Sequence, residues 1–261
     1  MNDFAIRSAG DLAQTVERCG FLPLLKNWIP GFSVEEHTPP ELWFAGDADG
    51  PWEWKGPVIE AAGCAYGKFF RGKVGFISRE WFADFANFRR GGCNLDVRYD
   101  EGFVRREDRA LYDVLADRPS LLSREWRHLA GIRNRGAFDA AAGRLQMMGY
   151  VTAAGFEYAR DRFGRLYGWG LARYATPERR FGESFIRAVY ARSPGASEQR
   201  ILLHLSALLA DASERDILRL MEGIWRRNAR WRKTTGCIQK GSRSCCSRWR
   251  RRQSARPSSR W

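Results

Sequence analysis

The sequence contains no long apolar run and very little histidine. No stretch reaches the roughly 18 apolar residues that a membrane-spanning helix needs, which excludes a span of that kind. The first 20 residues include Asp3, Asp11 and Glu17 and no uninterrupted apolar segment, so they do not have the pattern of a secretory signal. We therefore expect a cytoplasmic protein whose six cysteines stay reduced.

Clustered metal ligands are also lacking. The three histidines, His37, His128 and His204, lie far apart in the sequence, and the cysteines show no spacing typical of a zinc site. The sequence contains no Ser/His/Asp set, no glycine loop of the phosphate-binding type and no HExxH motif. We therefore expect neither a metal nor another cofactor.

Acidic residues are absent from the end of the chain, and this explains the net charge of +14. Residues 225–261 carry +13, whereas residues 1–104 carry −4, residues 105–176 carry +5 and residues 177–224 are neutral. This tail has no apolar periodicity, so three interpretations are open: a nucleic-acid-binding arm, a disordered tail, or translation past a frameshift. We favour the frameshift or another sequence-end artefact, and take no functional evidence from the tail.

Residues 1–104 predict an aromatic-rich α+β segment. A helix is expected from Ser8 to Cys19, and a hairpin around Arg71-Gly72. Residues 79–88 predict a helix with one stripe of phenylalanines. Residues 21–57 are expected to form ordered loops and short strands. If Trp52-Glu53-Trp54 is extended, both Trp side chains face one way and Glu53 faces the other.

Residues 105–176 predict a winged helix-turn-helix. Helices are expected at 108–116, from a cap at Ser123, and to about Met148, followed by strands at 150–159 and 165–174. In the second helix Trp126, Leu129 and Ala130 are expected to face inward. In the third, the inward residues are expected to be Phe138, Ala142, Leu145 and Met148.

Residues 177–224 predict C-terminal helices at 181–192, 197–210 and 213–221, with caps at Ser197 and Ser213. The predicted fold class is thus α+β, with the winged unit in the middle.

Six arginines lie on the two elements of a winged helix that meet DNA. The third helix enters the major groove, and the hairpin reaches the backbone or the minor groove. The predicted DNA contacts are Arg133, Arg135 and Arg144 on the third helix and Arg160, Arg162 and Arg165 at the hairpin turn. Such arginines also occur on ordinary solvated surfaces, and winged helices also bind proteins. We favour double-stranded DNA as the partner.

A second group of residues surrounds the tryptophans of the first segment. Glu35, His37 and Glu53 are weak catalytic candidates, because a carboxylate base beside aromatic walls suits an enzyme that acts on an extruded base. The alternative is a small aromatic core with solvated acids outside it. We favour this alternative.

Several short motifs resemble one family. They are Gly50-Pro-Trp-Glu-Trp-Lys-Gly-Pro57, Tyr66-Gly-Lys-Phe-Phe70, Gly75-Phe-Ile-Ser78, Arg144-Leu-Gln-Met147 and Tyr167-Gly-Trp-Gly170. They resemble the AlkZ-related proteins, which are similar to the AlkZ/YcaQ winged-helix DNA glycosylases that excise alkylated or crosslinked bases. The resemblance covers about residues 9–221. It implies a winged-helix fold and a role in DNA repair.

The catalytic signature of those glycosylases, Gln-x-Asp or Gln-x-Gln, is absent. None of the five glutamines is followed two positions later by Asp or Gln. The main hypothesis is therefore a winged-helix protein that binds duplex DNA without the family-type catalytic motif. The alternatives are an active glycosylase that uses Glu53 or Glu35, and a winged helix that binds another protein.

Overall fold

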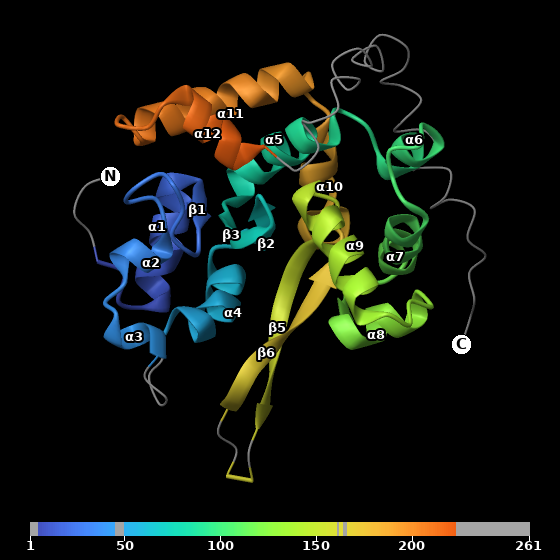
Figure 1. Ribbon diagram of the computed structural model, residues 1–261, viewed down its shortest axis with the longest axis horizontal. Helices are drawn as coiled ribbons and strands as arrows, with labels where there is room; N and C mark the ends of the chain where they lie inside the picture. Colours follow the sequence, from blue (N-terminus) through green and yellow to red (C-terminus); the bar gives the residue numbers. More distant parts are fainter. Residues whose placement is uncertain (1–4, 45–49, 161, 164–165, 223–261) are drawn as a thin grey trace.

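The computed structural model describes residues 5–44, 50–160, 162–163 and 166–222, which form a mixed α+β fold (Figure 1). The elements of the first part are α1 (Ala9–Cys19), β1 (Phe21–Pro23), α2 (Val34–His37), α3 (Glu41–Phe44), α4 (Pro51–Ala61), β2 (Ala65–Phe70), β3 (Lys73–Ile77), α5 (Arg79–Arg90) and α6 (Leu95–Asp100). The middle part contains α7 (Arg106–Ala116), β4 (Leu121–Leu122), α8 (Ser123–Leu129), α9 (Arg135–Met147), β5 (Thr152–Arg160) and β6 (Leu166–Ala175). The last part contains α10 (Pro177–Val189), α11 (Pro194–Leu208) and α12 (Glu214–Met221).

The first part is built on a small antiparallel sheet with strand order β1-β3-β2. The predicted hairpin at Arg71-Gly72 is confirmed: both residues have positive φ, which turns the chain from β2 into β3. The predicted first helix is confirmed as α1. The Ser8 hydroxyl accepts a hydrogen bond from the Asp11 amide at its start, and Gly20 ends it with φ 73°.

The Trp52-Glu53-Trp54 segment is helical, so the prediction of loops and short strands over residues 21–57 is wrong here, and the condition of an extended segment is not met. Pro51 at the start of α4 already has the φ that a helix needs, and the Glu53 carboxylate accepts a hydrogen bond from the Gly50 amide at 3.2 Å. The alternation of Trp and Glu imitated a strand pattern. Because the segment is a helix, Trp54 is buried whereas Trp52 is half-buried.

The middle part has the predicted order of three helices and a hairpin, with one further strand. The two-residue strand β4 lies between α7 and α8 and pairs with β6, giving a second sheet with order β4-β6-β5. The expected inward face of α9 is confirmed, since Phe138, Ala142, Leu145 and Met148 are all buried.

Two details of α8 differ from the prediction. The N-cap residue is Leu122 rather than Ser123, and the Glu125 carboxylate accepts a hydrogen bond from the Leu122 amide at 3.0 Å. Trp126 is fully buried as expected, but Leu129 is 47% exposed. Ala130, which follows the end of the helix, packs against the core cluster of the middle part as expected.

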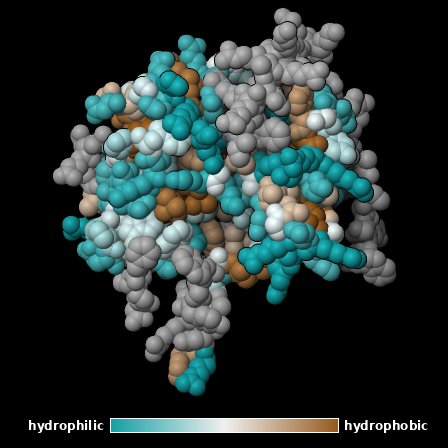
Figure 2. Space-filling model, viewed as in Figure 1, coloured by the Kyte–Doolittle hydropathy of each residue, from teal (hydrophilic) through white to brown (hydrophobic). Residues whose placement is uncertain are grey.

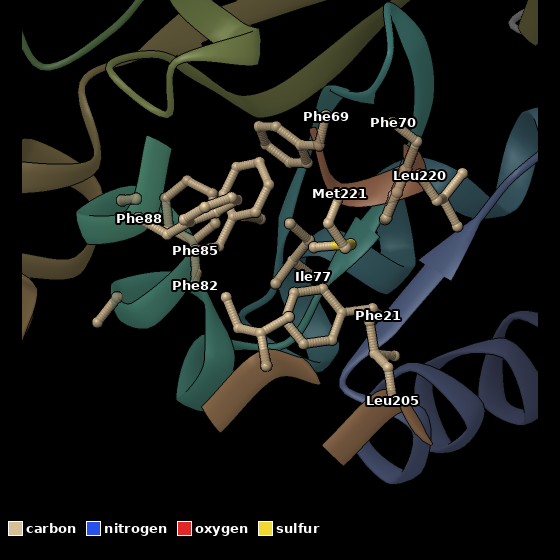
Figure 3. Close-up of a cluster of buried hydrophobic side chains, with 14 of the residues drawn as sticks. Phe21, Phe69, Phe70, Ile77, Phe82, Phe85, Phe88, Leu205, Leu220 and Met221 are labelled. Atoms are coloured by element: carbon tan, nitrogen blue, oxygen red, sulfur yellow. The ribbon is translucent and has the colours of Figure 1, made fainter. Parts of the chain in front are cut away.

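The C-terminal helices pack on α5 and share its core. Phe82, Phe85 and Phe88 form the predicted stripe on α5 and belong to the same buried cluster as residues from α10, α11 and α12. Figure 3 shows Leu205, Leu220 and Met221 among the labelled residues of this cluster. The last part of the chain therefore completes the hydrophobic core of the first part.

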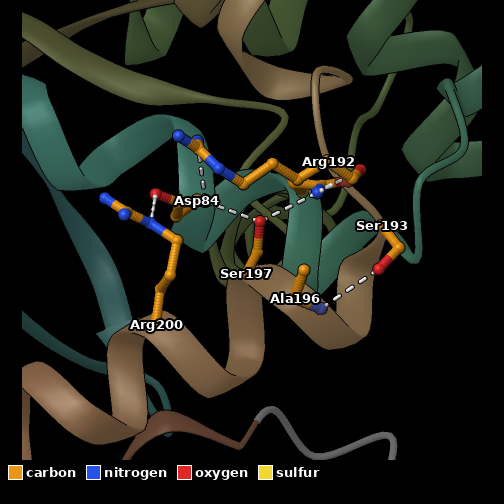
Figure 4. A network of polar contacts seen from close by, with 7 residues as sticks. Asp84, Arg192, Ser193, Ala196, Ser197 and Arg200 are labelled. Atoms are coloured by element: carbon orange, nitrogen blue, oxygen red, sulfur yellow. Dashed lines mark hydrogen bonds and ion pairs between the residues drawn. The ribbon is translucent and has the colours of Figure 1, made fainter.

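A buried polar network fixes α11 to α5 (Figure 4). Asp84 on α5 accepts a hydrogen bond from the Ser197 hydroxyl at 2.6 Å and forms an ion pair with Arg200 at 3.1 Å. Ser197 was predicted to cap a helix, but α11 begins earlier, with Ser193 as its N-cap. Ser197 instead lies inside the helix and faces α5. The predicted cap Ser213 is confirmed at α12.

Candidate nucleic-acid interface

A hollow lies on the surface of α8 and of the turn that leads to α9. Its volume is about 680 Å³. It is lined by Arg124, Glu125, Arg127, His128, Gly131, Ile132 and Arg133. Sequence reasoning identified only Arg133 of these. Arg124 and Arg127 are three residues apart on a helix and lie on one side of it, a spacing that was available as a signal.

The charge of this hollow is positive. In the part of the chain that the structure describes, Arg124, Arg127 and Arg133 form no ion pair. Glu125 is the single acid among the lining residues, and its carboxylate is engaged by the Leu122 amide. Three guanidinium groups and one carboxylate thus line a concave surface whose net charge is positive, which is an arrangement that attracts anions.

Only the beginning of α9 is open to solvent. Arg135 is 85% exposed and lies 3.7 Å from Asp139, while the Asn134 side chain caps the helix by accepting from the Ala137 amide. Farther along, α9 packs against β2, where the Gln146 side-chain oxygen accepts a hydrogen bond from the Lys68 amide at 3.1 Å. The accessible part of this helix is therefore its first turns, where the helix dipole is positive.

Arg144 faces the interior of the middle part. Its guanidinium donates bidentate hydrogen bonds to the Asp108 carboxylate of α7 at 2.6 to 3.0 Å. The Asp108 side chain is 1% exposed. The prediction that Arg144 lies on the open face of α9, where its replacement would leave the fold intact, does not agree with this geometry. The ion pair links α7 to α9.

The hairpin β5–β6 extends away from the rest of the molecule (Figure 1). At its end, Arg162 and Phe163 are exposed, and the Arg162 guanidinium lies 4.7 Å from the Phe163 ring centre. The space-filling view, seen from the same side, shows a hydrophobic and a hydrophilic group together at the far end of the hairpin (Figure 2). The side chains of Arg160 and Arg165, the other predicted contacts, lie outside the described residues. Phe163 is 67% exposed and was not identified from the sequence.

The hairpin is held against α4. The Tyr158 hydroxyl on β5 lies 3.4 Å from the carbonyl oxygens of Trp52 and Glu53. Gly170 on β6 leaves room for the Tyr158 ring, because a Cβ atom there would lie 2.7 Å from it. The tryptophan segment and the hairpin, which are about 100 residues apart in sequence, are therefore neighbours in space.

The three catalytic candidates are engaged by nearby backbone groups. The Glu35 carboxylate accepts a hydrogen bond from the Lys26 amide at 2.7 Å, and His37 contacts the Gly31 carbonyl at 2.8 Å. Both belong to α2, whereas Glu53 belongs to α4 and caps it. These contacts stabilise the loops around the tryptophans. They give Glu35 and His37 a structural role, while the exposed Glu53 is the candidate beside the hairpin.

Among the described residues there is no group of three or more His, Cys, Asp or Glu side chains that could hold a metal ion. Nor does any helix in those ranges have the length and apolar character to cross a membrane.

Comparison with known families shows to which family the chain belongs. The family described as "AlkZ related" matches residues 6–222, from the start of α1 to the end of α12. The chain belongs to the AlkZ-related family. No curated protein and no solved structure matches it in the corresponding comparisons. The family match ends at the point where the basic tail begins, so it covers all the elements described above.

Proposed function

We propose that residues 105–176 form a winged helix that binds double-stranded DNA, in a protein related to DNA repair. The order helix, short strand, helix, helix, hairpin is the arrangement of that fold, and the pairing of β4 with β6 closes its sheet. Membership of the AlkZ-related family supports the connection with repair.

The observation that carries the proposal is the cluster of three unpaired arginines at the turn between α8 and α9. In this arrangement the first turns of α9 enter the major groove, with Arg135 nearest the bases. Arg124, Arg127 and Arg133 contact backbone phosphates beside it. Arg162, together with Arg160 and Arg165, contacts the backbone or the minor groove at the hairpin end.

Binding is proposed without the catalysis that the family signature provides. Gln146 lies on α9 within one of the motifs that resemble the family, but the residue two positions later is Met148. Its side chain is buried and is bonded to the Lys68 amide and the Ala142 carbonyl. It links α9 to β2 and does not face a substrate.

Binding of a labelled duplex to the full chain, measured from about 50 to 200 mM salt, tests this function. Replacing both Arg127 and Arg133 with Ala is expected to reduce the slope of log K against log salt by about 2, because each phosphate contact releases close to one counterion. The exposed Arg187→Ala on α10 is the matched control, which keeps the tail and the fold unchanged. Equal slopes for all three proteins, or binding without salt dependence, would contradict the proposal.

A second candidate is base excision with Glu53 as the group that activates water. Glu53 is exposed on α4, and its own carbonyl lies within contact of Tyr158 on the proposed wing. A single-turnover assay on duplex DNA that contains 7-methylguanine tests this. Excision that is lost in Glu53→Gln and retained in Glu35→Gln would support it. Absence of excision by the unmodified chain excludes this function, and absence of duplex binding as well leaves the protein-binding winged helix.

A further inference from the structure

Lys55 is a buried amine enclosed by aromatic rings. It lies on α4 with 5% of its surface exposed. Its Nζ atom is 4.7 Å from the ring centre of Phe156 on β5 and 5.6 Å from that of Trp52. Trp52 and Phe156 are themselves only partly buried.

No acid lies within ion-pair distance of this amine in the described ranges. Lys55 forms no ion pair there, and the neighbouring Glu53 carboxylate is bonded to the Gly50 amide. Burial lowers the pKa of Lys55, and the charge of Glu53 opposes this shift. More of the amine is therefore neutral and nucleophilic near neutral pH than for a solvated lysine.

The hydrophobic cluster against which Trp52 and Phe156 pack contains donors that have no acceptors. The indole N–H groups of Trp43 and Trp54, which belong to the same hydrophobic cluster as Trp52 and Phe156, are buried without a hydrogen-bond partner. Trp43 packs against Trp52 with ring centres 5.8 Å apart, and Trp52 in turn lies over Lys55. A ligand with oxygen acceptors would satisfy these N–H groups, and one with an aldehyde would react with the neutral amine.

The position of Lys55 relates it to the proposed wing. Phe156, which covers the amine, and Tyr158, which contacts α4, both lie on β5. DNA bound along the hairpin would lie beside α4, because β5 contacts that helix. The inference about Lys55 therefore rests on the proposed DNA binding.

We propose that Lys55 forms an imine with the C1′ aldehyde of an abasic deoxyribose in duplex DNA. The neutral amine attacks C1′ and forms a C–N bond. Its two protons go to the carbonyl oxygen through solvent, and that oxygen leaves as one molecule of water. No electrons are gained or lost, so no oxidant or reductant takes part. The aromatic walls hold the sugar and limit access of water to the imine.

Trapping with borohydride tests the proposal. The full chain is mixed with a duplex that carries one aldehydic abasic site, and borohydride reduces the imine to a stable secondary amine. We expect a covalent protein–DNA product that peptide mass mapping assigns to Lys55. This mapping uses the unmodified chain, so it does not depend on whether a variant folds.

Two variants make the test specific. Lys55→Arg keeps the positive charge and its contacts with the rings but forms no imine, so the crosslink is expected to disappear. Lys68→Arg, on β2, is the matched control and is expected to leave the crosslink unchanged. A crosslink that persists in Lys55→Arg, or one spread over all lysines, would overturn the proposal.

Failure of this inference can be distinguished from failure of the DNA-binding proposal. Duplex binding is measured in the same samples, and free 2-deoxyribose with borohydride serves as a second probe. Duplex binding without trapping at Lys55 refutes the imine but leaves DNA binding intact. Labelling of Lys55 by deoxyribose in a chain that binds no duplex refutes the DNA substrate and the proposed function together.

Discussion

At the scale of single residues, the position of a charged side chain is determined by its partner more than by its place on a helix. Arg135 and Arg144 are both arginines of α9, but Arg135 is 85% exposed while Arg144 is bound to the buried Asp108. The two partners are 36 residues apart, and nothing in the local sequence of α9 indicates the contact. Arg124 and Arg127 were not predicted for a different reason: they lie on α8, outside the third helix and the hairpin turn that carry the predicted contacts.

Replacing Arg144 with Ala is expected to destabilise the fold by about 3–5 kcal/mol, because it leaves the Asp108 carboxylate buried and uncompensated. Arg135→Ala is the control and is expected to change stability by no more than about 0.5 kcal/mol. Urea unfolding followed by tryptophan fluorescence measures both. Equal stability of the two variants would show that the Asp108 contact contributes nothing to the fold.

At the scale of elements, periodic segments were predictable and elements defined by distant contacts were not. The helix α9 and the strands β5 and β6 follow apolar periodicity, and their predicted places agree with the structure to within about two residues. The strand β4 has two residues and exists because it pairs with β6, some 50 positions later. The helix α4 was hidden by two prolines and alternating tryptophans, although Gly50 and Pro51 together are a recognisable helix start.

In the candidate site, too, local features were predictable from the sequence and contacts between distant segments were not. Its arginines could be found from the sequence because charge on a predicted helix or turn is a local property. The contact of Tyr158 with α4, and with it the enclosure of Lys55 by Phe156, arises only when the hairpin folds back on the first part of the chain. The tryptophan motif was therefore noticed, but its neighbour on the hairpin was not.

At the scale of the whole molecule, the C-terminal helices share one core with α5 and with the strands of the first sheet. Ile201, Leu205 and Met221 are buried with the phenylalanines of α5, and the Asp84–Ser197 hydrogen bond joins the same two regions. Helices α10 to α12 thus cover apolar surface that the first part exposes without them. The middle part has a separate cluster, which contains Leu111, Trp126 and Leu145.

This arrangement predicts opposite results for two truncations. A chain that ends at Thr176 loses α10 to α12 and exposes the aromatic core of the first part. We therefore expect it to bind a hydrophobic dye and to lose its cooperative thermal transition.

A chain that ends at residue 224 keeps all three helices and loses only the segment of charge +13. Its net charge falls to +1, and we expect its melting temperature to stay nearly the same. Calorimetry and dye binding on both chains measure these outcomes. A cooperative transition in the chain that ends at Thr176 would mean that the first part folds without the C-terminal helices, and a large loss of stability on removal of residues 225–261 would mean that the basic segment contributes to the fold.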